Sequence, residues 1–95
     1  MMPAPREKSI TNAIMKAARE RGWWVLKLAA GPWQTPGLPD LLLIRGGTAR
    51  FMEVKTSTGR VTPHQQARMT EIERYAGARC DVVRSRDEAL AALDS

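Results

Sequence analysis

The apolar residues in the first quarter of the chain recur with a helical period. Between positions 6 and 21 most of them lie three or four residues apart, at Ile10, Ala13, Ile14, Ala17 and Ala18. Residues with this spacing share one face of an α-helix, so the pattern predicts an amphipathic helix that begins near Pro5 and ends at Gly22. Glu7 lies on the same stripe and is expected to point inward, although the helix dipole favours an acid in the first turn in any case.

A strand and a long loop are predicted next. The segment 23–28 is rich in aromatic and branched residues, which favour strands, and it carries Lys27 near its end. The segment 29–39 is rich in proline and glycine and predicts a stiff loop that leads to Asp40. Trp33 in this loop either packs on the core or stacks on an unpaired base.

A pair of glycines separates two strand-length runs in the middle of the chain. The run 41–44 is continuously apolar, which is typical of a strand covered on both faces, and the run 49–55 follows it. Two-residue hairpin turns require positive φ, which glycine adopts readily, so Gly46 and Gly47 predict a β-hairpin.

The register of this hairpin brings charged residues together. With the two glycines as the loop, counting outward pairs Asp40 with Glu53, and directly opposed side chains project to one face about 5 Å apart. Lys55 returns to the same face because strand side chains alternate. Lys55 is either the counter-ion of a surface acid pair, or the partner of two carboxylates that hold a hard divalent cation such as Mg²⁺. In the second case the cluster supports hydrolysis of a phosphodiester.

The second half of the chain begins with a well-marked helix. Thr62 is the expected N-cap, Pro63 takes the first helical position, and Gln65 completes a capping box. The helix is expected to run to about Ala76 and to stop at Gly77. Gln65 also lies on the inward face of the helix.

The remaining elements complete an α/β fold. The segment 80–84 predicts a last strand, and Ser85 and Glu88 predict a second capping box before a final helix. The order is αβββαβα within a single domain, residues 1–95, which implies a mixed four-stranded sheet flanked by helices.

The spacing of the charged cluster resembles a known nuclease signature. Pro39 and Asp40, twelve intervening residues, and then Glu53, Val54 and Lys55 are similar to the PD-(D/E)XK motif. Flanking segments narrow the resemblance to the VRR-NUC domain, the virus-type replication-repair nuclease; they are Glu7, the run 37–42, Phe51 and Met52, and the run 61–65. The resemblance covers nearly the whole chain and implies a restriction-endonuclease-like core.

The resemblance implies the roles of the site residues. Asp40 and Glu53 would bind Mg²⁺ or Mn²⁺ together with the Val54 carbonyl, and Glu7 would complete the shell directly or through water. Lys55 would activate the attacking water, and Gln65 would support that end of the site beside Lys55. One glutamine is not expected to serve both as the helix cap and in this role. An all-oxygen ligand set argues against zinc.

The substrate and the assembly follow from the same resemblance. It implies a metal-dependent, structure-specific DNA endonuclease that acts as a homodimer, because a four-way junction requires two symmetric incisions. Holliday-junction resolution is the first expectation, and flaps or other branched DNA come next. The basic residues expected to hold the DNA backbone are Lys27, Arg45, Arg50 and Arg60.

Composition is consistent with this interpretation and limits it. Lys and Arg outnumber Asp and Glu by 15 to 10, so the chain carries a net charge of +5, which favours a polyanionic partner. Cys80 is the only cysteine, so an internal disulfide and a cysteine zinc site are excluded, and a cytoplasmic, reducing location is expected. No apolar stretch approaches the length of a membrane span.

Two other functions remain open from the sequence alone. The first is a non-catalytic DNA-binding module in which the acid cluster is merely structural. The second is a sequence-specific restriction-type enzyme, although a chain of 95 residues leaves little room for a recognition domain.

Overall fold

The computed structural model describes residues 5–28 and 36–95, and Trp33 lies outside this part of the chain. Its elements follow one another in the predicted order αβββαβα. They are α1 (Glu7–Glu20), β1 (Trp24–Lys27), β2 (Leu41–Arg45), β3 (Thr48–Val54), α2 (Pro63–Ala76), β4 (Arg79–Val83) and α3 (Arg86–Leu93). None of the helices described is long and apolar enough to cross a membrane.

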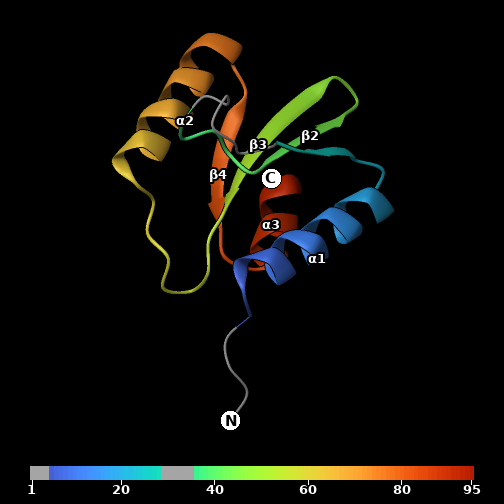
Figure 1. Cartoon of the computed structure of the whole chain (residues 1–95). Helices are drawn as coiled ribbons and strands as arrows, with labels where there is room; N and C mark the ends of the chain where they lie inside the picture. The colour runs from blue at the N-terminus through green and yellow to red at the C-terminus, as the bar shows by residue number, and fades with distance from the viewer. Residues whose placement is uncertain (1–4, 29–35) are drawn as a thin grey trace.

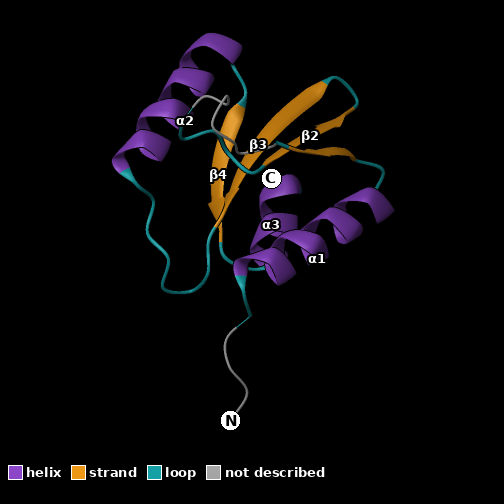
Figure 2. Ribbon diagram, viewed as in Figure 1, coloured by secondary structure: helices purple, strands orange, loops and turns teal. Residues whose placement is uncertain are grey.

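The four strands form one mixed sheet in the order β1-β2-β3-β4. The first two pairs are antiparallel and β3 pairs with β4 in parallel, since α2 makes the crossover between them. Helices α1 and α3 pack against each other over one face of the sheet, while α2 lies beside β4 (Figures 1 and 2). The predicted α/β fold, a mixed sheet flanked by helices, is confirmed.

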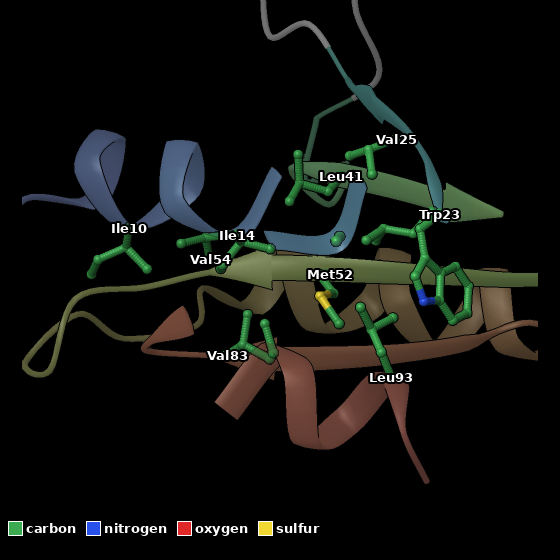
Figure 3. Close-up of a cluster of buried hydrophobic side chains, with 12 residues drawn as sticks. Ile10, Ile14, Trp23, Val25, Leu41, Met52, Val54, Val83 and Leu93 are labelled. Atoms are coloured by element: carbon green, nitrogen blue, oxygen red, sulfur yellow. The ribbon is translucent and has the colours of Figure 1, made fainter. Parts of the chain in front are cut away.

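The hydrophobic core lies between the sheet and the pair α1 and α3. Alternate residues of β2 and β3 point into it, and they meet Ile10 and Ile14 of α1 and Leu93 of α3 (Figure 3). The fully buried apolar residues of β2 and β3 are Leu41, Leu43, Met52 and Val54. Burial of one large aliphatic side chain contributes about 1.5–3 kcal/mol to the stability of the fold. A register slip by one residue would expose these side chains, so their burial also fixes which strand residues point away from the core.

The hairpin has the register that the glycine pair predicts. Gly46 and Gly47 have φ of 54° and 80°, and the ladder runs from Arg45 opposite Thr48 to Leu41 opposite Met52. Next to the last pair of the ladder, the Asp40 N–H donates to the Met52 carbonyl at 3.0 Å, and the pKa of Glu53 is raised by a hydrogen bond to Asp40. Asp40 and Glu53 therefore face each other on the side of the sheet opposite the core.

The helix caps agree with the sequence, with one difference. Helix α2 has the full capping box on Thr62 and ends at Gly77, which has φ of 65°. In α3 the Ser85 hydroxyl accepts from the Glu88 N–H, but the Glu88 carboxylate accepts from the Arg84 N–H, one residue before the cap. The predicted second capping box is therefore only half formed.

Candidate active site

Asp40 is fixed by backbone groups of two strands. Its carbonyl accepts from the Leu28 N–H at 2.8 Å, and its N–H donates to Met52. Its carboxylate oxygen Oδ2 accepts from the Val54 N–H at 2.7 Å, which is short, as expected of a charged acceptor. The acid therefore completes the sheet where the regular ladder stops, and its position is set by the fold.

Glu53 is the acid opposite Asp40 and is 2% exposed. Its Oε1 accepts from the Gln65 side-chain Nε2 at 3.2 Å, and the Lys55 Nζ lies 3.9 Å from the same oxygen. Its Oε2 is buried and has no hydrogen-bond partner among the described residues. An ionised carboxylate in this position has one oxygen that neither water nor a protein donor stabilises.

The surroundings of Glu53 strongly disfavour its charged form. Burial raises the pKa of Glu53 to about 8, with further increases from a hydrogen bond to Asp40 in the protonated form and from the charge of Asp40. The charge of Lys55 lowers this pKa and that of Glu7 raises it. The positive charge of one ammonium thus does not offset the negative charges of the two neighbouring carboxylates. A further cation at this site would reduce the remaining excess of negative charge.

Gln65 performs both roles that the sequence sets against each other. Its Oε1 accepts from the Thr62 N–H at 3.0 Å in the capping box, while its Nε2 donates to Glu53. The prediction that one glutamine cannot easily do both is wrong, because an amide carries its acceptor and its donor on different atoms. The start of α2 is thereby joined to the end of β3.

Glu7 lies at the beginning of α1 and is exposed. The prediction that it points inward is wrong, because its side chain is exposed at the start of the helix. Its charge nevertheless contributes to the raised pKa of Glu53.

The oxygen atoms at this point suit a hard cation. The Val54 N–H points to Asp40, and the N–H and C=O of one strand residue point the same way, so the Val54 carbonyl also faces the Asp40 side. In residues 5–28 and 36–95 no three acidic, His or Cys side chains form a ready metal cage. An ion would therefore rest on two carboxylates, a carbonyl and waters, with Glu7 near, as Mg²⁺ commonly does.

A solved structure of similar chain length shares the fold of this chain. A scan against family models and a search of curated proteins give no match. Among solved structures, one described as a VRR_NUC domain is 29% identical, with a TM-score of 0.73, and the match covers 93% of this chain and 94% of that one. The resemblance of this chain to the VRR-NUC domain is confirmed.

Two further structures share the VRR-NUC fold at lower identity. A second VRR_NUC domain protein has a TM-score of 0.81 at 17% identity, over 97% of this chain and 88% of that chain. Hjc of Archaeoglobus fulgidus, a Holliday junction resolvase, has a TM-score of 0.67 at 16% identity, over 82% of this chain and 67% of that chain.

Two of the basic residues predicted to bind DNA, Arg45 and Arg50, make contacts with other parts of the chain. Arg45 stacks on Trp23 at 4.5 Å and donates to the Arg21 carbonyl, at the opposite end of β2 from Asp40. Arg50 donates to the carbonyls of Ala92 and Ser95.

Lys27 and Arg60 are exposed, and Lys27 directly precedes Leu28, whose N–H donates to the Asp40 carbonyl. Lys27 pairs with Leu41 and so starts from the core-facing side of the sheet, whereas Glu53 is on the other side. Arg60 lies in the loop that follows Lys55. Sequence reasoning also missed Arg84, whose contacts with this loop span more than twenty positions and have no local signature.

Proposed function

We propose that the protein is a divalent-metal-dependent endonuclease that hydrolyses phosphodiester bonds in branched DNA, with the four-way junction as its first substrate. The observation that carries the proposal is the opposed pair Asp40 and Glu53 beside Lys55 and Gln65. One oxygen of Glu53 is buried and has no hydrogen-bond partner in residues 5–28 and 36–95. The VRR-NUC relationship and the fold shared with a junction resolvase support the choice of substrate.

Each residue of the pair has a task that its geometry allows. Asp40, Glu53 and the Val54 carbonyl would hold Mg²⁺ or Mn²⁺, with Glu7 acting directly or through water. When bound, the ion would supply Lewis-acid polarisation of the phosphoryl oxygen and lower the pKa of a bound water. Gln65 holds Oε1 of Glu53 through its Nε2 and so keeps the carboxylate oriented.

In the proposed mechanism the Lys55 ammonium lies beside the scissile phosphate. Its side chain is 12% exposed, and its ammonium contacts Glu53 from the same face of β3. An ammonium placed there would orient the attacking water and stabilise negative charge that develops on the phosphoryl oxygens. This role of Lys55 does not require a histidine as a general acid or base.

Two incisions in one junction require two sites, so we propose a homodimer. Strand β1 is an edge of the sheet, and Trp24, Leu26 and Ile44 expose 55%, 44% and 37% of their surface. Apolar surface of this kind beside an open edge strand is typical of an association site. Light scattering should give a dimer that Trp24→Ser weakens, whereas Tyr75→Ser, on the exposed face of α2, leaves it intact.

The function is tested with labelled duplex, flap and four-way DNA in Mg²⁺, Mn²⁺ or chelator. Asp40→Asn keeps an acceptor for the Val54 N–H, and Lys55→Met keeps the aliphatic stem, so each removes mainly charge. Both should lower the cleavage rate by about 10²-fold or more with little loss of DNA binding, whereas Lys16→Met on α1 should not. Metal-independent cutting, or wild-type rates in both site variants, would refute the mechanism.

The same panel separates the neighbouring functions. Preferred cleavage of flaps would identify a flap nuclease with the same chemistry. Tight, salt-sensitive binding to junctions without any cutting in either metal would identify a non-catalytic DNA-binding module.

A further inference from the structure

The two halves of the site are joined by a loop without regular structure. Strand β3 ends at Val54 and carries Glu53, with Lys55 directly after it, and α2 begins at Pro63 and carries Gln65. The intervening loop runs along one side of the molecule, in yellow-green between β3 and α2 in Figure 1. The directions in which Lys55 and Gln65 reach Glu53 therefore depend on how this loop is held.

The first part of the loop is a tight turn that packs on Lys55. The Gly59 N–H donates to the Thr56 carbonyl at 3.2 Å and to the Thr56 hydroxyl at 3.1 Å. A Cβ placed on Gly59 would lie 3.2 Å from the Thr56 hydroxyl and 3.5 Å from the Lys55 Cβ. The turn leaves room for glycine and little more, so its position is coupled to that of the Lys55 side chain.

One side chain that is distant in the sequence, that of Arg84, clamps this turn. The Arg84 Nη1 donates to the carbonyls of Thr56 and Gly59, both at 2.6 Å. These carbonyls belong to the first and last residues of the turn, so a single guanidinium nitrogen ties its two ends together. Arg84 is partly buried, where a charge-assisted hydrogen bond is stronger than at an open surface.

The backbone on either side of Arg84 is itself anchored. The Arg84 N–H donates to the Glu88 carboxylate at 3.0 Å, which ties it to the first turn of α3. The preceding carbonyl, that of Val83, accepts from the Lys55 N–H at 3.0 Å. The junction of β4 and α3 therefore holds Lys55 through its backbone and the next four residues through the Arg84 side chain.

We propose that Arg84 is a positioning residue of the active site, which acts by clamping the Thr56–Gly59 turn and so directs Lys55 toward Glu53. The clamp itself is a property of the folded chain, and its effect on catalysis rests on the proposed nuclease function. Arg84 touches neither Glu53 nor Asp40 among its hydrogen bonds, so its effect on the reaction would pass through the loop.

The first test measures the position of Lys55 without any activity assay. Reductive methylation followed by peptide mass spectrometry reports the reaction rate of each lysine, and Lys16 on α1 is an internal standard. In Arg84→Gln the Lys55 rate should rise about tenfold, because the loop opens locally, and exchange of the Gly59 amide should accelerate in parallel. Arg86→Gln is the matched control, since Arg86 is exposed and its side chain pairs only with Asp87 among the described residues.

The second test measures cleavage of whichever labelled DNA the wild type cuts. Arg84→Gln should lower kcat about tenfold or more with KM for DNA within about twofold, and Arg84→Lys should recover part of kcat because an ammonium can bridge two carbonyls. If Arg84→Gln does not fold, Arg84→Lys carries both tests, with a smaller effect in the same direction. Urea unfolding of each variant establishes that it is folded.

The outcomes are distinct. An unchanged Lys55 methylation rate in the folded variants would overturn the clamp. A raised methylation rate with wild-type kcat would overturn the positioning role. If the wild type cuts no DNA, the proposed function fails, and the methylation and exchange rates still decide whether Arg84 directs Lys55.

Discussion

Glu53 makes the stability of the metal-free protein depend on pH in an unusual direction. Most acids in folded proteins have lowered pKa values and stabilise the fold as pH rises. Glu53 has its pKa raised from 4.5 to about 8 by burial and by Asp40. Its ionisation is therefore opposed by the fold, and raising the pH in the presence of chelator is the perturbation to apply.

The size of the effect follows from the shift. Between pH 4.5 and 8 the folded chain holds a proton on Glu53 that the unfolded chain has lost, so the free energy of unfolding falls as pH rises through this window. A shift from 4.5 to about 8 corresponds to about 5 kcal/mol, at about 1.4 kcal/mol for each pH unit. The loss is absent below pH 4.5 and complete above pH 8. It is comparable with the whole stability of a small domain, about 5–15 kcal/mol.

The assay is urea unfolding at a series of pH values in chelator and in Mg²⁺. Glu53→Gln is the matched variant, because glutamine has the same shape and does not titrate. Between pH 5 and 8 the unfolding free energy of the wild type should fall by several kcal/mol relative to that of Glu53→Gln. Mg²⁺ should restore wild-type stability at pH 8 and leave Glu53→Gln nearly unchanged, because a ligand stabilises the state that binds it. Burial raises the pKa of Cys80 to about 11, so its titration lies outside this range.

A single result would refute this reasoning. If the difference between wild type and Glu53→Gln is flat from pH 5 to 8 in chelator, then Glu53 is not held in the unfavourable setting described above. A flat difference together with a clear Mg²⁺ effect would place the cation elsewhere.

Two further substitutions test single contacts at the start of α2. Gln65→Glu keeps the capping box but places a carboxylate against Glu53. Cleavage should therefore fall at least about tenfold, while the helix content measured by circular dichroism is unchanged. Loss of helix with intact cleavage would show that Gln65 acts as a cap and not through Glu53. Gly37→Ala puts a Cβ 2.5 Å from the His64 carbonyl oxygen. The Cβ of Gly46→Ala meets no atom of the described part of the chain within 4 Å, although both glycines have positive φ. Gly37→Ala should therefore cost about 2 kcal/mol or more in urea unfolding beyond the cost of Gly46→Ala, and equal losses would show that the contact with α2 is unimportant.

The backbone of the site could be predicted from the sequence because its determinants are local. The turn at Gly46 and Gly47 sets the hairpin register, and the apolar alternation of β3 decides which face Glu53 occupies. From these alone Asp40 and Glu53 are expected to meet, and they do. The caps of α2 are local in the same sense, since Thr62 and Gln65 lie within one helical turn.

The long side chains could not be placed in this way, because their partners are distant in the sequence. Arg45 reaches Trp23 and Arg50 reaches the last turn of α3, so both are engaged in packing where the sequence suggests free cations. Arg84 contacts a turn 25 and 28 positions earlier. Glu7 lies on the apolar stripe of its helix and is nevertheless exposed, since a periodic pattern does not show where the sheet beneath a helix ends.

The residues of this site also complete elements of secondary structure. The Asp40 carboxylate takes the Val54 N–H where the ladder stops, and Gln65 caps α2 while it holds Glu53. Substitutions that remove these polar groups altogether, such as Asp40→Ala or Gln65→Ala, should therefore change folding and chemistry together. Lys55 is different, because its side chain makes one long contact to Glu53 and belongs to no cap or ladder. Loss of activity without loss of stability is consequently expected at Lys55, and it is the position at which a chemical role can be separated from a structural one.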